Sequence, residues 1–265
     1  MKIRLVAGLL AAASLAGACA NTDAEPESAS SASVERYSRN PYPSTYQPYP
    51  GVPTLVTNVT IYDGEGGRID NGAVLFADGK IVELGQTVAA SDGATVIAGP
   101  GKWVTPGMIG VHSHLGNYPS PSVEAHSDGN EATNPVHPDV WAEHGVWPQD
   151  PGFSRALANG GVTSLQILPG SADLFGGRSV TLKNVPARTM QGMKFPGAPY
   201  GLKMACGENP PRTYGARNQM PQTRMGNIAL VRETWIKARA YDRKWDRYER
   251  TGGDMPERDL AMDTL

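Results

Sequence analysis

Two histidines one residue apart end an apolar, β-branched run of the chain. His112 and His114 follow residues 104–111, Val-Thr-Pro-Gly-Met-Ile-Gly-Val. On a strand, residues i and i+2 point to the same side, so both imidazoles lie on one face at the end of the strand. Imidazole is the commonest protein ligand of zinc and similar divalent ions. The pair predicts one half of a metal site; two solvated histidines are the alternative.

The residues before this histidine pair have the pattern of short strands. Residues 74–77 and 80–84 are apolar runs that flank Asp78-Gly79. An Asp-Gly pair between two such runs indicates a hairpin closed by a type I′ turn. Further Asp-Gly and Asn-Gly pairs at Asp63, Asn71 and Asp92 give residues 53–104 the pattern of a small β-sandwich.

These motifs together resemble one family. Residues 74–85, Val-Leu-Phe-Ala-Asp-Gly-Lys-Ile-Val-Glu-Leu-Gly, and residues 101–116, Gly-Lys-Trp-Val-Thr-Pro-Gly-Met-Ile-Gly-Val-His-Ser-His-Leu-Gly, are similar to the amidohydrolase superfamily. The imidazolonepropionase-like, metal-dependent members are the nearest match. The resemblance runs from about Pro53 to the C-terminus. It has one departure: family members usually carry Asp where this chain has Gly110.

The predicted fold class is α/β: a partial (β/α)8 barrel, residues 105–265, preceded by the β-sandwich segment, residues 53–104. Strands are expected at 104–111, 162–168, 179–183 and 200–206, and helices at 153–159 and 227–250. Alternating strands and helices indicate parallel βα units. A complete barrel needs roughly 250 residues, so the chain holds about the first half, which favours a fragment or a truncated product.

Lys203 is the third candidate metal ligand. It lies in the apolar run of residues 201–206, where a lysine is expensive to bury unless it is neutralised or paired. The resemblance implies that Lys203 could be carbamylated and bridge two ions. Glu208, just after the same strand, is the rival bridging carboxylate. A lysine in a salt bridge remains the alternative, and in a one-metal relative neither residue need be a ligand.

Substrate contacts are expected from two further residues. Arg178, after Gly176-Gly177, could grip a substrate carboxylate with two parallel hydrogen bonds, or be an ordinary surface arginine. His126 and His144 lie in the long segment after His114. We expect this segment to cover the metal and line the substrate pocket. A surface position is expected for His137. The resemblance also implies a general-base Asp, which we place beyond Leu265 because no Asp here has a fitting context.

The N-terminus has the pattern of an export signal. Residues 1–20 contain Lys2 and Arg4, then an apolar stretch too short to span a bilayer, then small residues before Cys19. This predicts an exported protein of the periplasm or cell envelope, with Cys19 as a candidate lipidation site and membrane tether. Residues 21–52, rich in Ser, Pro and Tyr, are expected to be a linker, unless the tyrosines pack on the domain.

Composition excludes several other classes. The chain has 265 residues, a formal net charge of −2 and 40% hydrophobic residues, enough for one large or two small domains. The balanced charge argues against a nucleic-acid partner. The chain has no Gly-x-Ser-x-Gly elbow, Walker loop or Cys-x-x-Cys pair.

The resulting hypothesis is a hydrolase of carbon–nitrogen bonds. One or two divalent ions, zinc first, would activate a water against a small-molecule amide, a cyclic amide or a dipeptide. The alternative is a truncated, catalytically inactive envelope lipoprotein or binding module. An oligomer is compatible with either hypothesis.

Overall fold

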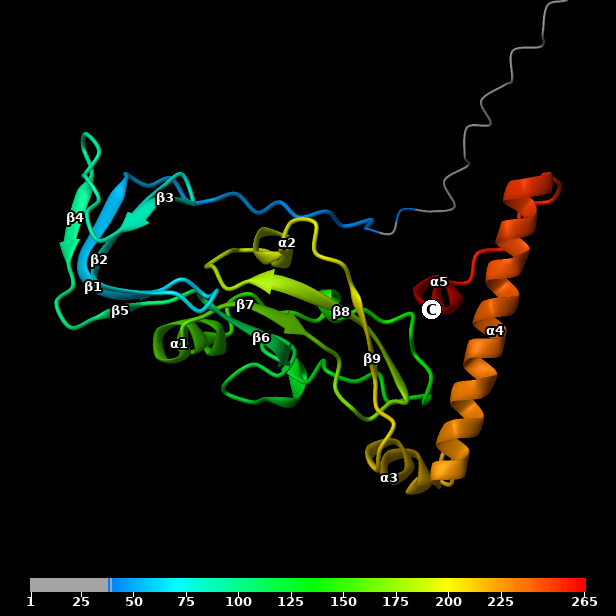
Figure 1. Ribbon diagram of the computed structural model, residues 1–265. Helices are drawn as coiled ribbons and strands as arrows, with labels where there is room; N and C mark the ends of the chain where they lie inside the picture. Colours follow the sequence, from blue (N-terminus) through cyan, green and yellow to red (C-terminus); the bar gives the residue numbers. More distant parts are fainter. Residues whose placement is uncertain (1–37, 39) are drawn as a thin grey trace, which may run out of the picture. The chain divides into compact units, whose positions relative to one another are not determined.

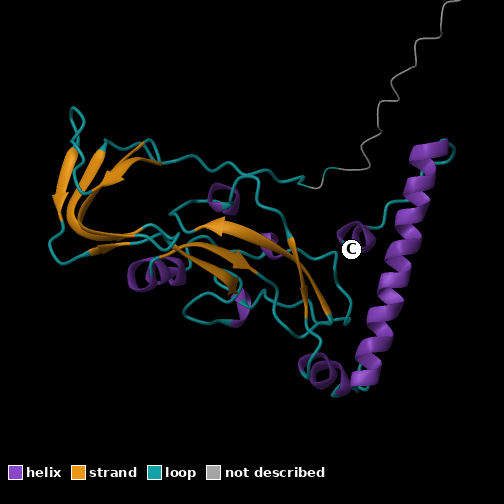
Figure 2. Ribbon diagram, in the orientation of Figure 1, coloured by secondary structure: helices purple, strands orange, loops and turns teal. Residues whose placement is uncertain are grey.

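The computed structural model describes Ser38 and residues 40–265 (Figures 1 and 2). These residues belong to one compact unit, Arg36–Leu265. The predicted export signal and Cys19 lie outside the described residues. Within the described residues, no helix has the length and apolarity needed to cross a membrane.

The first sheet is built from the predicted short strands. It contains β1 (Thr54–Tyr62), β2 (Arg68–Ala77), β3 (Lys80–Gly85), β4 (Thr95–Ala98) and β5 (Trp103–Val104). The order is β3-β2-β1-β4, with β5 also paired to β1. The β2–β3 pair is antiparallel, and Asp78 and Gly79 have φ of 51° and 72°, which confirms the type I′ hairpin. The region predicted as a β-sandwich forms this one sheet.

The second sheet carries the candidate site. It contains β6 (Met108–Ser113), β7 (Val162–Ile167), β8 (Phe175–Lys183) and β9 (Gly201–Met204), in that order, and it is curled (Figure 1). The predicted strand at 104–111 is wrong at its start: Val104 pairs with Ile61 in the first sheet. Pro106 has no N–H to donate, so one continuous ladder cannot pass through it.

Only part of the expected parallel pattern exists. β6 and β7 are parallel, but β8 is antiparallel to both β7 and β9. The prediction of parallel βα units is therefore wrong for β8. A parallel partner needs a crossover of a dozen or more residues, and the connection from Ile167 to Phe175 is too short for one. The chain makes a hairpin instead.

Most of the helices are short. They are η1 (Glu124–His126), η2 (Ala142–His144), α1 (Pro151–Gly160), α2 (Met190–Met193), α3 (Asn209–Gly215) and α5 (Leu260–Thr264). The predicted helix at 153–159 is confirmed by α1. Asp150 caps its first turn by accepting from the Gly152 amide, and Gly161, with φ of 60°, ends it.

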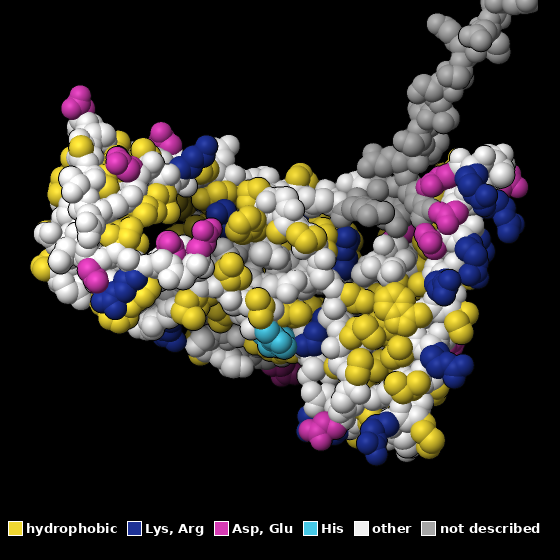
Figure 3. All heavy atoms as spheres, in the orientation of Figure 1, with side chains coloured by type: hydrophobic (Ala, Val, Ile, Leu, Met, Phe, Trp, Pro, Cys, Tyr) yellow, Lys and Arg dark blue, Asp and Glu magenta, His cyan; other side chains and the backbone are white. Residues whose placement is uncertain are grey.

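The long charged helix is confirmed by α4 (Arg224–Thr251). Its predicted apolar side is only partly right. Ala238 and Trp245 are buried, whereas Ile228 and Ile236 are 57% and 63% exposed. Lys and Arg side chains follow the outer edge of α4 in Figure 3.

The core lies between the second sheet and its short helices. Leu165, Ile167, Val180 and Leu182 from β7 and β8 are at most 1% exposed and pack with Phe153 of α1. Alternate residues of each strand supply this face, as the two-residue period of a strand requires.

The Tyr- and Pro-rich segment before β1 is held against this core. The Ser44 hydroxyl donates to the Lys194 carbonyl at 2.6 Å, and the Thr45 amide donates to the Gln191 carbonyl at 3.0 Å. The Lys194 ammonium donates to the Tyr42 carbonyl at 2.6 Å. Residues 40–49, which fall in the predicted linker, thus make specific contacts, and we call them the strap.

Candidate metal and substrate site

Three strands of the second sheet end at the same edge. Because β8 is antiparallel to both of its neighbours, β9 runs in the same direction as β7 and β6. The carboxyl ends of co-directional strands and the loops that follow them form the usual place for functional residues in such sheets. His112 and His114 are at the end of β6, and Lys203 is at the end of β9.

The two histidines point at each other. The Nε2 atoms of His112 and His114 are 3.3 Å apart, and the ring planes meet at 88°. Two imidazole nitrogens bound to one tetrahedral zinc ion, each about 2.0–2.1 Å from it, would be about 3.3 Å apart. The pair therefore has the spacing that adjacent ligands of one ion require.

The orientation of His114 is fixed by its second nitrogen. His114 Nδ1 lies 2.8 Å from the Leu168 carbonyl oxygen, at the end of β7. A carbonyl can only accept, so Nδ1 carries a proton, and in the neutral ring Nε2 keeps its lone pair. Holding the outer nitrogen in this way is a common means of orienting metal-binding histidines.

Lys203 is buried close to the histidines. It is 8% exposed, and desolvation lowers its pKa. Its positive charge is the largest cause of the lowered pKa of His112, followed by desolvation and by His114. Both effects favour neutral nitrogens, the form that binds a metal or reacts with carbon dioxide.

These residues fit part of a metal site. The spacing of the histidines and the tautomer of His114 suit a divalent ion, and Lys203 would add a ligand once carbamylated. In the described part of the chain, no group of three or more His, Cys, Asp or Glu side chains has metal-binding geometry. The ligand roles of His112, His114 and Lys203 stay predictions.

A polar hollow of about 270 Å³ opens beside His114. It is bordered by the loops that follow β6 and β7 and by α3. The side chains that matter most in it are those of His114, Tyr118, Asn130, Ser171, Asn209 and Arg212. The amide of Asn209 connects two of them, since it accepts from Arg212 Nη2 at 3.0 Å and donates to Ser171 Oγ at 2.7 Å.

Arg178 does not border this hollow. Its guanidinium lies between the rings of Trp141 and Tyr200, 4.1 Å and 3.9 Å from their centroids. Cation–π contacts with these two rings hold the group in place. Its predicted role in substrate binding stays a prediction, while Arg212, a weaker sequence candidate, is the arginine beside His114.

The other sequence candidates lie in different surroundings. His126 packs on Trp147, and exposed His144 stacks on Trp141. Glu208 is exposed at the start of α3. His137 is half-buried, with a side chain 18% exposed, so its predicted surface position is only partly right. None of these four residues borders the hollow.

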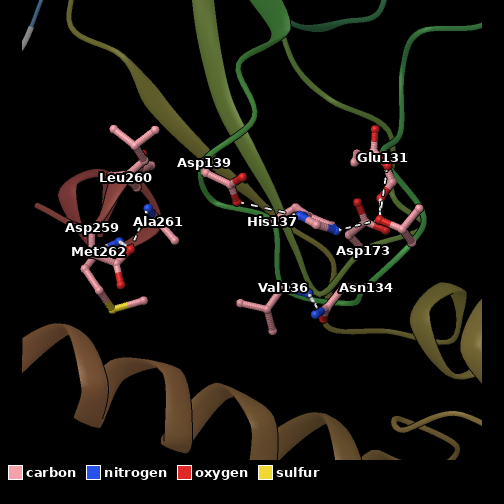
Figure 4. Close-up of polar contacts among 12 residues, drawn as sticks. Glu131, Asn134, Val136, His137, Asp139, Asp173, Asp259, Leu260, Ala261 and Met262 are labelled. Carbon is pink, nitrogen blue, oxygen red and sulfur yellow. Dashed lines mark hydrogen bonds and ion pairs between the residues drawn. The ribbon is translucent and has the colours of Figure 1, made fainter.

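His137 belongs to a separate polar cluster (Figure 4). His137 Nδ1 lies 3.6 Å from Asp139 Oδ1, and His137 Nε2 lies 3.0 Å from the Thr133 hydroxyl oxygen. Asp173, fully buried nearby, accepts a hydrogen bond from Tyr214. Desolvation raises the pKa of Asp173, and the Tyr214 hydrogen bond and the His137 charge oppose this. Through Tyr214 the cluster anchors α3, the helix that carries Asn209 and Arg212.

Sequence reasoning missed Asp150. This carboxylate is 2% exposed and accepts from the amides of Gly116 at 2.9 Å, Ser120 at 3.2 Å and Gly152 at 2.8 Å. It thus joins the loop after His114 to the start of α1. The Asp-Pro-Gly sequence at 150–152 signals a helix cap, but no local pattern indicates the contact with Gly116.

Comparison with known proteins places these features in a family context. No family model matches the chain. The chain is 32% identical over 222 residues to amidohydrolase tasK of Hapsidospora irregularis, which is 74% of this chain and 22% of that protein. It is 45% identical over 71 residues to the imidazolonepropionase of Stenotrophomonas maltophilia, 24% of this chain and 17% of that protein.

The three-dimensional comparison extends further. A crystal structure of an amidohydrolase from Thermotoga maritima MSB8 matches with a TM-score of 0.74 and 38% identity, covering 80% of this chain and 54% of that one. The chain thus spans about half of that protein and about a fifth of the curated relatives named above. Similarity over most of the chain, in both sequence and structure, shows that it belongs to the amidohydrolase superfamily, as the residues around His112 predicted.

Proposed function

We propose that this chain forms part of a metal-dependent hydrolase that cleaves carbon–nitrogen bonds of amides, cyclic amides or dipeptides. The observation that carries the proposal is the 3.3 Å separation of His112 Nε2 and His114 Nε2 at the end of β6. The proposed whole fold is the (β/α)8 barrel of the family, to which β6–β9 would contribute.

Each residue has a defined part. His112 and His114 would hold the ion, and the Leu168 carbonyl would keep His114 in its ligand tautomer. Lys203, with its lowered pKa, would supply a neutral amine that adds carbon dioxide and releases a proton, becoming an anionic carbamate. A bound zinc ion would supply a water whose pKa is brought to about 7.

The test measures metal content and hydrolysis in the same preparations. We expect stoichiometric metal in the purified chain, found by mass spectrometry of the elements, and its loss in His112→Ala and His114→Ala. His144→Ala is the matched control, because exposed His144 stacks on Trp141 away from the hollow. Hydrolysis is then screened with N-acyl amino acids, dipeptides and cyclic amides.

Two results would contradict the proposal. One is metal content in the double alanine variant equal to that of the unmodified chain. The other is turnover that survives both substitutions. A metal-free, well-folded monomer without turnover would favour a binding module instead.

A further inference from the structure

We propose that the hollow beside His114 binds a carboxylate of the substrate and that Arg212 is its cationic anchor. The inference deepens the proposed function and rests on it, because it takes His114 to mark the reaction centre. It narrows the substrates to amides that carry a carboxylate close to the bond that is cleaved.

The hollow lies at the right place and has the right size. Its lining runs from His114, at the end of β6, to Arg212 of α3, after β9, within a volume of about 270 Å³. That volume suits a small molecule rather than a polymer segment. A ligand bound to Arg212 would therefore extend toward the histidine pair.

Arg212 is placed to accept an anion. Within the described residues, the Arg212 side chain makes one hydrogen bond, from Nη2 to Asn209 Oδ1. It forms no ion pair with a carboxylate there. A guanidinium offers five donors in a planar fork that matches a carboxylate. Most of these donors remain for a ligand.

Asn209 also orients a second donor, the Ser171 hydroxyl. Its Nδ2 donates to Ser171 Oγ at 2.7 Å, so the hydroxyl oxygen is used as an acceptor and the hydroxyl hydrogen is left to donate. Arg212 and Ser171, joined through one amide, would thus present donors from α3 and from the loop after β7. Such a pair distinguishes a charged carboxylate from a neutral carboxamide, which offers one oxygen instead of two.

The buried carboxyl of Asp173, next to the hollow in the sequence, has partners of its own. Asp173 adjoins the pocket residue Ala172, but desolvation raises its pKa and Tyr214 donates to it. Arg217 lies close to Asp173 and Tyr214, where its charge opposes both raised pKa values. The Asp173 carboxyl is thus partnered by other residues, and it forms no ion pair with Arg212.

The test compares two probes that differ only in charge. Binding of N-acetylglycine and of neutral N-acetylglycinamide to the full chain is measured by calorimetry, with inorganic phosphate as a third probe. We expect N-acetylglycine to bind more tightly than the other two. Arg212→Gln should weaken N-acetylglycine binding roughly 10- to 100-fold and leave N-acetylglycinamide unchanged, with partial recovery in Arg212→Lys.

A matched control separates charge from folding. Arg232→Gln removes an exposed arginine of α4 outside the hollow and should bind like the unmodified chain. Circular dichroism reports folding of each variant. Equal affinity for the charged and neutral probes, equal losses in Arg212→Gln and Arg232→Gln, or phosphate binding as tight as N-acetylglycine would overturn the assignment.

The binding test is distinct from the test of the proposed function. Binding needs neither metal nor turnover, so charge selectivity that depends on Arg212 in a chain without metal or hydrolysis would support the pocket and contradict the enzyme. Metal binding together with hydrolysis that does not depend on the charge of the substrate would support the proposed hydrolase. It would contradict the carboxylate pocket at Arg212.

Discussion

Substitution of Lys194 by Met should strongly destabilise the fold. Lys194 and Glu143 form a salt bridge of 2.7 Å, with side chains 4% and 0% exposed. The ammonium also donates to Asn40 Oδ1 at 3.0 Å and to the Tyr42 carbonyl at 2.6 Å. One side chain thus joins η2 and the strap to the end of α2.

The magnitude follows from what the substitution leaves behind. Without Lys194, the buried Glu143 carboxylate retains the Tyr200 hydroxyl, 3.1 Å and 3.3 Å from its two oxygens, as its side-chain donor. One hydroxyl cannot compensate a desolvated charge. Breaking a buried pair by removing one partner costs about 3–5 kcal/mol, whereas replacing both partners by apolar groups is often nearly neutral. Lys194→Met/Glu143→Leu should therefore regain most of the lost stability.

The assay is urea denaturation followed by circular dichroism. Lys237→Met is the matched control, because Lys237 pairs with Glu233 on α4 with side chains 63% and 56% exposed. Such a pair contributes at most about 0.5 kcal/mol. A Lys194→Met variant within about 1 kcal/mol of the unmodified chain, or a double variant no more stable than Lys194→Met, would refute the reasoning.

Three further predictions use the same measurement. Asp150→Ala should lose about 2–4 kcal/mol, because it removes a helix cap and charged hydrogen bonds to two loop amides; an Asp139→Ala control, with a carboxylate 41% exposed, should change little. Lys203→Met should stabilise the metal-free chain by about 1–2 kcal/mol, since it removes a buried ammonium; a loss of stability would argue for an ion pair instead. The raised pKa of Asp173 means that the folded chain keeps a proton that the unfolded chain has lost. The unmodified chain should therefore lose stability as the pH rises from the unfolded value of 3.8 through the folded pKa, and Asp173→Asn, which still accepts from Tyr214, should lose less; identical pH profiles would contradict this.

Local sequence signals determined the individual elements. The Asp78-Gly79 hairpin, α1 with its glycine stop, and α4 follow from turn, cap and periodicity rules that act over a few residues. The same rules placed His112 and His114 on one face of a strand, because that geometry depends only on the two-residue period.

Tertiary structure decided what these elements contact. The reversal of β8, the position of Arg178 between two aromatic rings and the placement of Arg212 beside His114 all join residues far apart in the chain. Whether an arginine borders a hollow or packs on Trp141 depends on strand pairing and packing, which single-residue preferences do not encode. The sequence by itself therefore determined the family and the strand that carries the histidine pair, while the fold decided which cation lies beside that pair.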